Sequence, residues 1–176
     1  MAQGWLDRLI RDVPDFPEPG VVFKDITPLL AHHQAFTDIV AALSDAARSV
    51  ADGRIDVVAG IEARGFILAA PVSLTLGAGF VPVRKQGKLP GDTHAVSYSL
   101  EYGDATLEVK ADAFGPGSRV LLLDDVLATG GTVAATADLV RETGADVVGV
   151  VVLLELGFLN GRARLGDLPV TALRTV

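Results

Sequence analysis

The apolar run at residues 55–59 most limits the folds open to this chain, because its apolar residues do not alternate with polar ones. Such a run is typical of a parallel strand covered by helices on both faces. Strand-length apolar runs recur at 80–83, 120–123 and 147–154, and helical spacing lies between them, as at 66–76. This alternation predicts an α/β fold with a mainly parallel twisted sheet flanked by helices.

The N-terminal part predicts helices and an extended segment. Apolar residues at helical spacing predict a short helix over 5–13, which ends there because a residue preceding proline avoids the α region. The prolines and glycine at 14–20 predict an extended segment, and Thr27 is expected to cap a helix. A second amphipathic helix is expected over 36–50.

Composition narrows the class of protein. A chain of 176 residues fits one domain, and no apolar run reaches the roughly 20 residues of a membrane helix. The first residues lack the pattern of a secretory signal, and the absence of cysteine fits a reducing cytoplasm. The net charge of −7 disfavours a nucleic-acid partner, although a few converging cations could still bind a small polyanion.

The segment VLLLDDVLATGGT at residues 120–132 is the most informative of the chain. It predicts a buried strand ending in Asp124 and Asp125, followed by a small-residue loop that opens a helix at about Thr132. The backbone N–H groups at such a helix start bind phosphate, helped by the helix dipole. The predicted phosphate ligands are Ala128, Thr129, Gly130, Gly131 and Thr132.

The adjacent carboxylates Asp124 and Asp125 predict a sugar or metal site. Side chains of neighbouring residues point to different sides, so together they can grip the vicinal hydroxyls of ribose or orient a hydrated magnesium ion. Taken alone, the two aspartates could merely end a strand and the two glycines could merely form a turn. The complete segment at 120–132 favours a binding role. It is not a Walker loop, because no lysine follows the glycines.

Three further segments carry candidate functional residues. Residues 60–66 read as a tight loop between glycines in which Arg64 can meet an anion, although ordinary strand-to-helix connections look similar. Residues 84–91 combine three cations with two glycines, which predicts a mobile basic loop. The alternating residues at 97–101 and 106–109 predict a hairpin that projects from the sheet.

The 120–132 segment resembles the phosphoribosyl pyrophosphate signature of the type I phosphoribosyltransferases, and the other segments agree with that family in order. The resemblance implies that residues 84–110 form a flexible loop and hairpin, in which Glu101 is catalytic and Tyr102 holds the closed loop. It also implies a cis peptide bond between Glu62 and Ala63. The implied pyrophosphate ligands are Glu62, Ala63, Arg64, Arg84, Lys85 and Lys88.

Residues 14–28 are similar to the base-binding hood of the family's adenine-specific members, and we assign the hood to residues 1–34 of a single domain. By that resemblance Val22, Phe23 and Lys24 hold adenine, with Leu127 on its other face. The implied reaction converts adenine and phosphoribosyl pyrophosphate to AMP and pyrophosphate. It would use Mg²⁺ held mainly by substrate and water and oriented by Asp124 and Asp125, in a cytoplasmic homodimer.

Two other functions remain open. A phosphoribosyltransferase for another base would share the 120–132 signature, but Phe23 and the segment around Glu101 argue against it. A regulatory protein that senses phosphoribosyl pyrophosphate would need the phosphate loop without a catalytic glutamate. Such regulators usually carry a DNA-binding module, and this acidic chain leaves no room for one.

Overall fold

The computed structural model describes residues 2–99 and 104–176, and the chain forms two compact units, Met1–Ala42 and Leu43–Val176. The first unit contains the whole segment predicted as a hood. In the described residues, no helix is both long and apolar enough to cross a membrane.

The first unit combines short helices with a two-stranded antiparallel sheet. Strand β1 pairs with β2 so that Val13 lies opposite Phe23. The rings of Phe16 and Phe23 meet edge to face at 5.1 Å. The elements of this unit are α1 (Ala2–Leu9), β1 (Arg11–Pro14), β2 (Val22–Asp25), α2 (Thr27–Ala31) and the start of α3 (His33–Val50).

Two N-terminal boundaries differ from the sequence-based prediction. Helix α1 ends at Leu9, because Arg11–Pro14 pairs with β2 instead of continuing the helix. Thr27 is the first residue of α2 and not its cap. Its backbone N–H donates to Oδ1 of Asp25 at 2.8 Å, so the aspartate two residues earlier serves the start of this helix.

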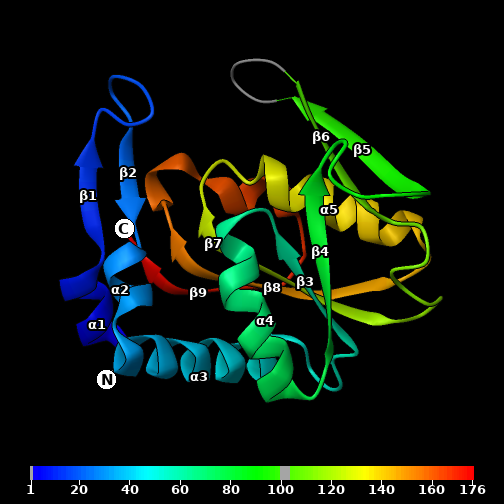
Figure 1. The fold of residues 1–176 in the computed structure, drawn as a ribbon, viewed down its shortest axis with the longest axis horizontal. Coiled ribbons are helices and arrows are strands. Elements are labelled where there is room, and N and C mark those ends of the chain that lie inside the picture. The colour runs from blue at the N-terminus through cyan, green and yellow to red at the C-terminus, as the bar shows by residue number, and fades with distance from the viewer. Residues whose placement is uncertain (1, 100–103) are drawn as a thin grey trace. The chain divides into compact units, whose positions relative to one another are not determined.

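The second unit is built on a seven-stranded sheet with the order β5-β6-β4-β3-β7-β8-β9 (Figure 1). Strands β4, β3, β7, β8 and β9 run parallel, whereas β6 pairs antiparallel with β4 and with β5. The mainly parallel α/β fold is therefore confirmed. Its elements are β3 (Val57–Ile61), α4 (Arg64–Leu76), β4 (Gly79–Lys85), β5 (Thr93–Ser99), β6 (Asp104–Lys110), β7 (Arg119–Leu127), α5 (Gly131–Glu142), β8 (Asp146–Glu155), the 3₁₀ helices η1 (Gly157–Leu159) and η2 (Gly161–Leu165), and β9 (Val170–Thr175).

Helices α4 and α5 cover opposite faces of this sheet, as Figure 1 shows. Along β3, Ala59 and Ile61 belong to the buried cluster that includes apolar residues of α5. Gly60 between them faces α4, because a Cβ added there would lie 2.8 Å from Cβ of Ala69. Side chains alternate between the faces of a strand, so both faces of β3 are buried, as predicted for the apolar residues at 55–59, although the strand begins at Val57 and continues to Ile61.

Three boundaries near the predicted site are corrected. Strand β7 does not end at Asp124 and Asp125 but continues to Leu127, because its backbone goes on pairing with β8. Arg84 and Lys85 belong to β4 and not to a loop. The predicted hairpin is present, with Ser99 opposite Asp104, and it joins the main sheet because β6 pairs with β4.

We expect Gly60→Ala to destabilise the protein, because the added methyl group would press on Ala69 of α4 and on the Phe80 ring, 2.8 Å away in each case. Overpacking of this kind costs about 1–3 kcal/mol, measurable by urea unfolding. The matched control is Gly79→Ala in β4, where the nearest atoms lie 3.7 Å away. Equal unfolding midpoints for the two variants would show that the contact between β3 and α4 is not tight.

Candidate active site

The site lies where the strand order of the sheet reverses. From β3 the chain moves to β4 on one side, and then to β7, β8 and β9 on the other. In open α/β sheets ligands bind beyond the carboxyl ends of strands at such a switch point. A cavity of about 730 Å³ lies there, lined by Glu62, Ala63, Arg64, Lys85, Gln86, Tyr98, Asp104, Ala105, Thr106, Leu107, Asp124, Asp125 and Thr132.

Asp124 and Asp125 are buried in the wall of this cavity, at 9% and 5% exposure. Oδ1 of Asp124 accepts a hydrogen bond from the backbone N–H of Asp125 at 2.8 Å. Oδ2 of Asp125 lies 2.7 Å from Nε of Arg64, which comes from the start of α4. The loop after β3 and the end of β7 therefore meet through an ion pair, although its alignment leaves that oxygen without a hydrogen bond.

Burial controls the charge of the two aspartates. It raises the pKa of Asp124 well above its ordinary value, and the neighbouring Asp125 raises it further. Burial also raises the pKa of Asp125, against the opposing effect of Arg64. Two buried carboxylates can carry more negative charge than the single cation beside them neutralises. A further positive group would balance that charge.

The loop between β7 and α5 forms a second, smaller cavity of about 70 Å³. Gly130, with φ of 81°, is the N-cap of α5 and offers no side chain, so among the described residues no side chain caps this helix. The first N–H groups of a helix have no partner within it and attract anions. Asp124 and Thr132 line both cavities, which are therefore adjacent.

The C-terminal segment supports this loop, a role that sequence reasoning missed. A Cβ added to Gly161, the first residue of η2, would overlap the carbonyl oxygen of Ala128, and one added to Gly130 would overlap that of Gly161. The backbone N–H of Leu156 donates to the carbonyl oxygen of Leu127 at 2.9 Å. No local pattern marks Gly161, because the contact depends on how distant segments pack.

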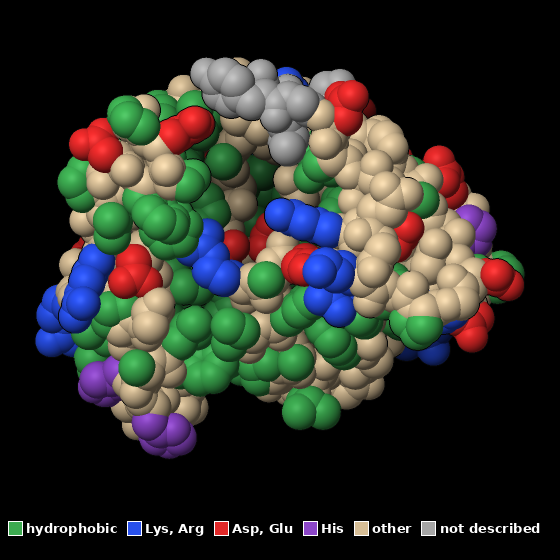
Figure 2. Space-filling view, turned by 45° about the horizontal axis from the view of Figure 1, so that its top comes forward, with side chains coloured by type: hydrophobic (Ala, Val, Ile, Leu, Met, Phe, Trp, Pro, Cys, Tyr) green, Lys and Arg blue, Asp and Glu red, His purple; other side chains and the backbone are tan. Residues whose placement is uncertain are grey.

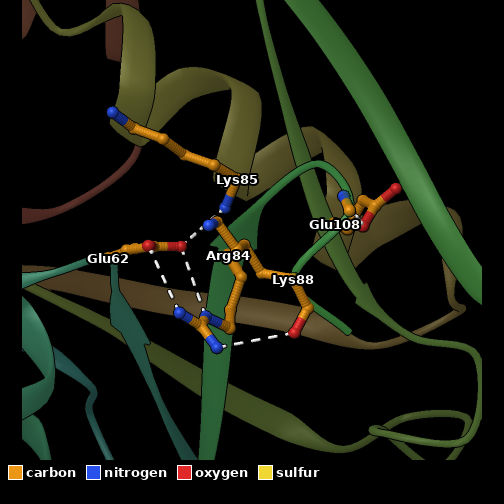
Figure 3. A network of polar contacts seen from close by, with 6 residues as sticks. Glu62, Arg84, Lys85, Lys88 and Glu108 are labelled. Carbon is orange, nitrogen blue, oxygen red and sulfur yellow. Dashed lines mark hydrogen bonds and ion pairs between the residues drawn. The ribbon is translucent and has the colours of Figure 1, made fainter. Parts of the chain in front are cut away.

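The loop after β3 has a cis peptide bond between Glu62 and Ala63, as the family resemblance implies. The carboxylate of Glu62 faces the guanidinium of Arg84, at 3.3 and 3.4 Å, and accepts the backbone N–H of Lys85 at 2.8 Å (Figure 3). Burial alone would raise the pKa of Glu62, but these bonds outweigh it and lower that pKa. Glu62 therefore acts as an anion that holds the end of β4.

The turn after β4 is fixed by a second carboxylate. Oε2 of the buried Glu108, in β6, accepts the backbone N–H of Gly87 at 3.0 Å, and Gly87 has a φ of 78° that favours glycine. Nη1 of Arg84 lies 3.5 Å from the carbonyl oxygen of Lys88. Near the centre of the molecular face in Figure 2, Lys and Arg side chains lie next to Asp and Glu side chains.

The predicted pyrophosphate ligands are only partly brought together. Ala63, Arg64 and Lys85 line the larger cavity with Glu62, whereas Arg84 and Lys88 are not among the described residues that line it. The guanidinium of Arg84 instead meets Glu62 and lies 5.8 Å from the centre of the Phe66 ring.

The predicted adenine ligands lie in both units. Val22, Phe23 and Lys24 form most of β2 in the first unit, where Nζ of Lys24 pairs with Asp12 at 2.7 Å. The Leu127 side chain is fully buried in the core cluster of the second unit. The predictions for Glu101 and Tyr102 fall outside the described residues.

Comparison with known proteins agrees with this geometry. Residues 26–166 match the family model of the phosphoribosyl transferase domain. The chain belongs to the phosphoribosyl transferase family. It is 61% identical, over 97% of its own length and 96% of the relative's, to an adenine phosphoribosyltransferase of Thermobifida fusca (strain YX).

Solved structures of this family share the fold. The adenine phosphoribosyltransferase of Rhodothermus marinus is 50% identical, with a TM-score of 0.93 over 99% of this chain and 98% of the other. That of Trypanosoma brucei, solved with AMP, pyrophosphate and ribose-5-phosphate, is 25% identical, with a TM-score of 0.87 over 99% of this chain and 79% of the other.

The residues of the site fit a metal held largely by its substrate. Residues 2–99 and 104–176 contain no group of three His, Cys, Asp or Glu side chains able to hold a metal ion. Asp124 and Asp125 supply two buried carboxylates, which suit magnesium when phosphate oxygens and water complete its ligands.

We expect Asp124→Asn to stabilise the protein increasingly as pH rises. The folded-state pKa of Asp124 lies above the unfolded value of 3.8. The contribution of the protonated Asp124 to folding stability is therefore fully present below about pH 4 and is lost as pH rises through the folded pKa. An asparagine in its place carries no such penalty, and each 1 kcal/mol shifts Tm by about 2–4 °C for a protein of this size. Melting curves at pH 4.5 and 7.5 measure the difference.

The control is Asp112→Asn, at an exposed position after β6. Its Tm should follow that of the unmodified protein at both pH values. A Tm difference for Asp124→Asn that is equal at pH 4.5 and 7.5 would contradict the burial of a charge-bearing carboxylate at this position.

Proposed function

We propose that this protein transfers the ribose 5-phosphate of phosphoribosyl pyrophosphate to adenine, giving AMP and pyrophosphate. The bond from the ribose anomeric carbon to pyrophosphate breaks with its electron pair on the leaving oxygen, and a bond to N9 of adenine forms as N9 loses its proton. The observation that carries the proposal is the buried pair Asp124 and Asp125 beside the uncapped start of α5. The chain's identity of 61% to an adenine phosphoribosyltransferase supports the base.

The loop at residues 128–132 is proposed to bind the 5-phosphate. The small cavity lined by this loop and the free N–H groups at the start of α5 support that role. Binding energy from a phosphate remote from the reacting carbon fixes the geometry of the sugar.

Asp124 and Asp125 are proposed to hold the ribose hydroxyls, and with them the metal. Magnesium would offset charge on the departing pyrophosphate. Ala63, Arg64 and Lys85, which line the larger cavity with Glu62, would contact the pyrophosphate from the protein side. Because positive charge develops on the sugar, the two aspartates would also stabilise the ribose electrostatically.

Arg84 and Lys88 are proposed to reach pyrophosphate from a second copy of the chain. Neither residue is among the described residues that line the cavity of its own chain, and Arg84 pairs with Glu62. Exposed apolar side chains on α4, Ile67 at 44% and Leu74 at 81%, support a homodimer. We also infer that the enzyme works in the cytoplasm.

The base is proposed to bind along β2. Adenine has an N1 acceptor and an N6 donor on one edge, whereas hypoxanthine has a donor and an acceptor there, so a site matched to one mismatches the other twice. The extended backbone of Val22–Asp25 offers C=O and N–H groups for that edge, with Phe23 stacking on the ring.

Glu101 is proposed to exchange a proton with N7 of the base. Its position three residues after Tyr98, which lines the cavity, supports a place near the substrate. A closed loop would also exclude water, which would otherwise hydrolyse the oxocarbenium-like centre.

We expect adenine to be preferred over hypoxanthine by at least about a thousandfold in kcat/KM. Each mismatch leaves a buried polar group unpaired at about 1–3 kcal/mol. Steady-state assays with adenine, hypoxanthine, guanine and orotate measure the preference. Lys24→Ala is the control, because backbone recognition should leave the ratio intact. Similar kcat/KM values for adenine and hypoxanthine would overturn the proposed base.

We expect Glu101→Gln to lower kcat by about 10²–10⁴-fold, the usual contribution of a general acid or base. The KM for phosphoribosyl pyrophosphate should change little, since the phosphate loop and the aspartates are intact. Asp112→Asn, at an exposed position outside both cavities, is the control. Full activity of Glu101→Gln would remove this carboxylate from the mechanism.

A further inference from the structure

We propose that Tyr98 is a positioning residue for the 5-phosphate, because its hydroxyl orients the hydroxyl of Thr132 toward that group. The inference rests on the proposed function, in which the 128–132 loop binds phosphate. It concerns a residue outside that loop, 34 positions earlier in the chain than Thr132.

Tyr98 connects the edge of the sheet to the start of α5. It is the next-to-last residue of β5, and its phenol oxygen lies 3.1 Å from Oγ1 of Thr132. Its half-buried ring packs against the buried cluster that includes α5 residues. A Cβ added to Gly131 would lie 3.5 Å from that ring, so the ring lies over the first residue of the helix.

Thr132 lies at the boundary between the two cavities. It lines the small cavity of the phosphate loop and the larger cavity, whereas Tyr98 lines only the larger one. As the second residue of α5, Thr132 also offers a backbone N–H from the uncapped first turn. Its hydroxyl can therefore face a phosphate group while Tyr98 approaches it from the other side.

The chemistry of hydroxyl groups gives this contact a direction. A hydroxyl has one proton to donate and two lone pairs, and either oxygen of the Tyr98–Thr132 pair could be the donor. Ionised phosphate oxygens only accept. When Thr132 donates to phosphate, it can only accept from Tyr98, and each bond of such a chain polarises the next. Tyr98 thus favours the hydroxyl orientation that binds phosphate.

The same hairpin contains a matched pair without this role. Oγ of Ser97 lies 2.8 Å from Oγ1 of Thr106, a hydroxyl pair that links β5 to β6 on the exposed side. Ser97 is not among the described residues that line either cavity, and its partner Thr106 lines the larger cavity but not that of the phosphate loop. Loss of the Ser97 hydroxyl therefore removes a similar bond from the same strand without touching the phosphate loop.

The test measures binding of ribose 5-phosphate and of pyrophosphate by calorimetry. Tyr98→Phe should weaken ribose 5-phosphate about fivefold, the effect of one net hydrogen bond, and leave pyrophosphate within about twofold. The KM for phosphoribosyl pyrophosphate should rise similarly, with kcat and the KM for adenine unchanged. Ser97→Ala should bind both ligands like the unmodified protein.

A second pair of variants separates positioning from general damage to the hairpin. Tyr98→Phe should cause no further loss in a Thr132→Val background, which lacks the hydroxyl, but should keep its effect in Thr132→Ser, which retains it. Equal losses in both backgrounds, equal losses for both ligands, or no loss at all would overturn the inference. If the unmodified protein did not bind ribose 5-phosphate, the proposed function itself would fail, whereas normal binding by Tyr98→Phe would remove only the role of Tyr98.

Discussion

The parallel pairing of β3 with β7 is the constraint on which the rest of the site depends. It sets Gly60 beside Leu123, so β3 ends next to Asp124 and Asp125 of β7. The ion pair between Arg64 and Asp125 joins the start of α4 to β7. Placing two carboxylates in such a buried position is costly. The cost is offset by apolar burial on both faces of the sheet, which is why the surrounding strands carry almost no polar residues.

Much of the fold could be predicted from local patterns. The wrong boundaries of the predicted elements share one cause, which is backbone pairing with a strand elsewhere in the chain. Unbroken apolar runs identified the parallel strands, because burial on both faces leaves a signal in each strand itself. Strand β7 was predicted too short since backbone pairing needs no apolar side chain, and Asp124 pairs with Val152 like its neighbours. Residues 11–13 fit a helical pattern by local spacing, and only their pairing with β2, which begins at Val22, makes them a strand.

The site was harder to predict, because several of its contacts join residues far apart in sequence. The aspartates and the phosphate loop lie in one segment, so their proximity follows from the sequence. The pairing of Glu62 with Arg84 spans 22 residues and depends on how β3 and β4 align. Within its own chain Arg84 meets this carboxylate, a contact that local sequence does not predict. Nothing in the composition of residues 84–91 distinguishes an arginine that pairs with a carboxylate of the chain from one that contacts a ligand.

The close approach of Gly130 and Gly161 has a consequence for how this enzyme can evolve. Two side chains that clash can usually be reconciled, because one shrinks when the other grows. Here each glycine faces backbone, the carbonyl oxygens of Gly161 and Ala128 respectively, so neither position has a side chain that could be reduced to make room. A larger residue at either position could be accepted only by moving η2 away from the loop. These two positions therefore lack compensating partners and are closed to gradual sequence drift.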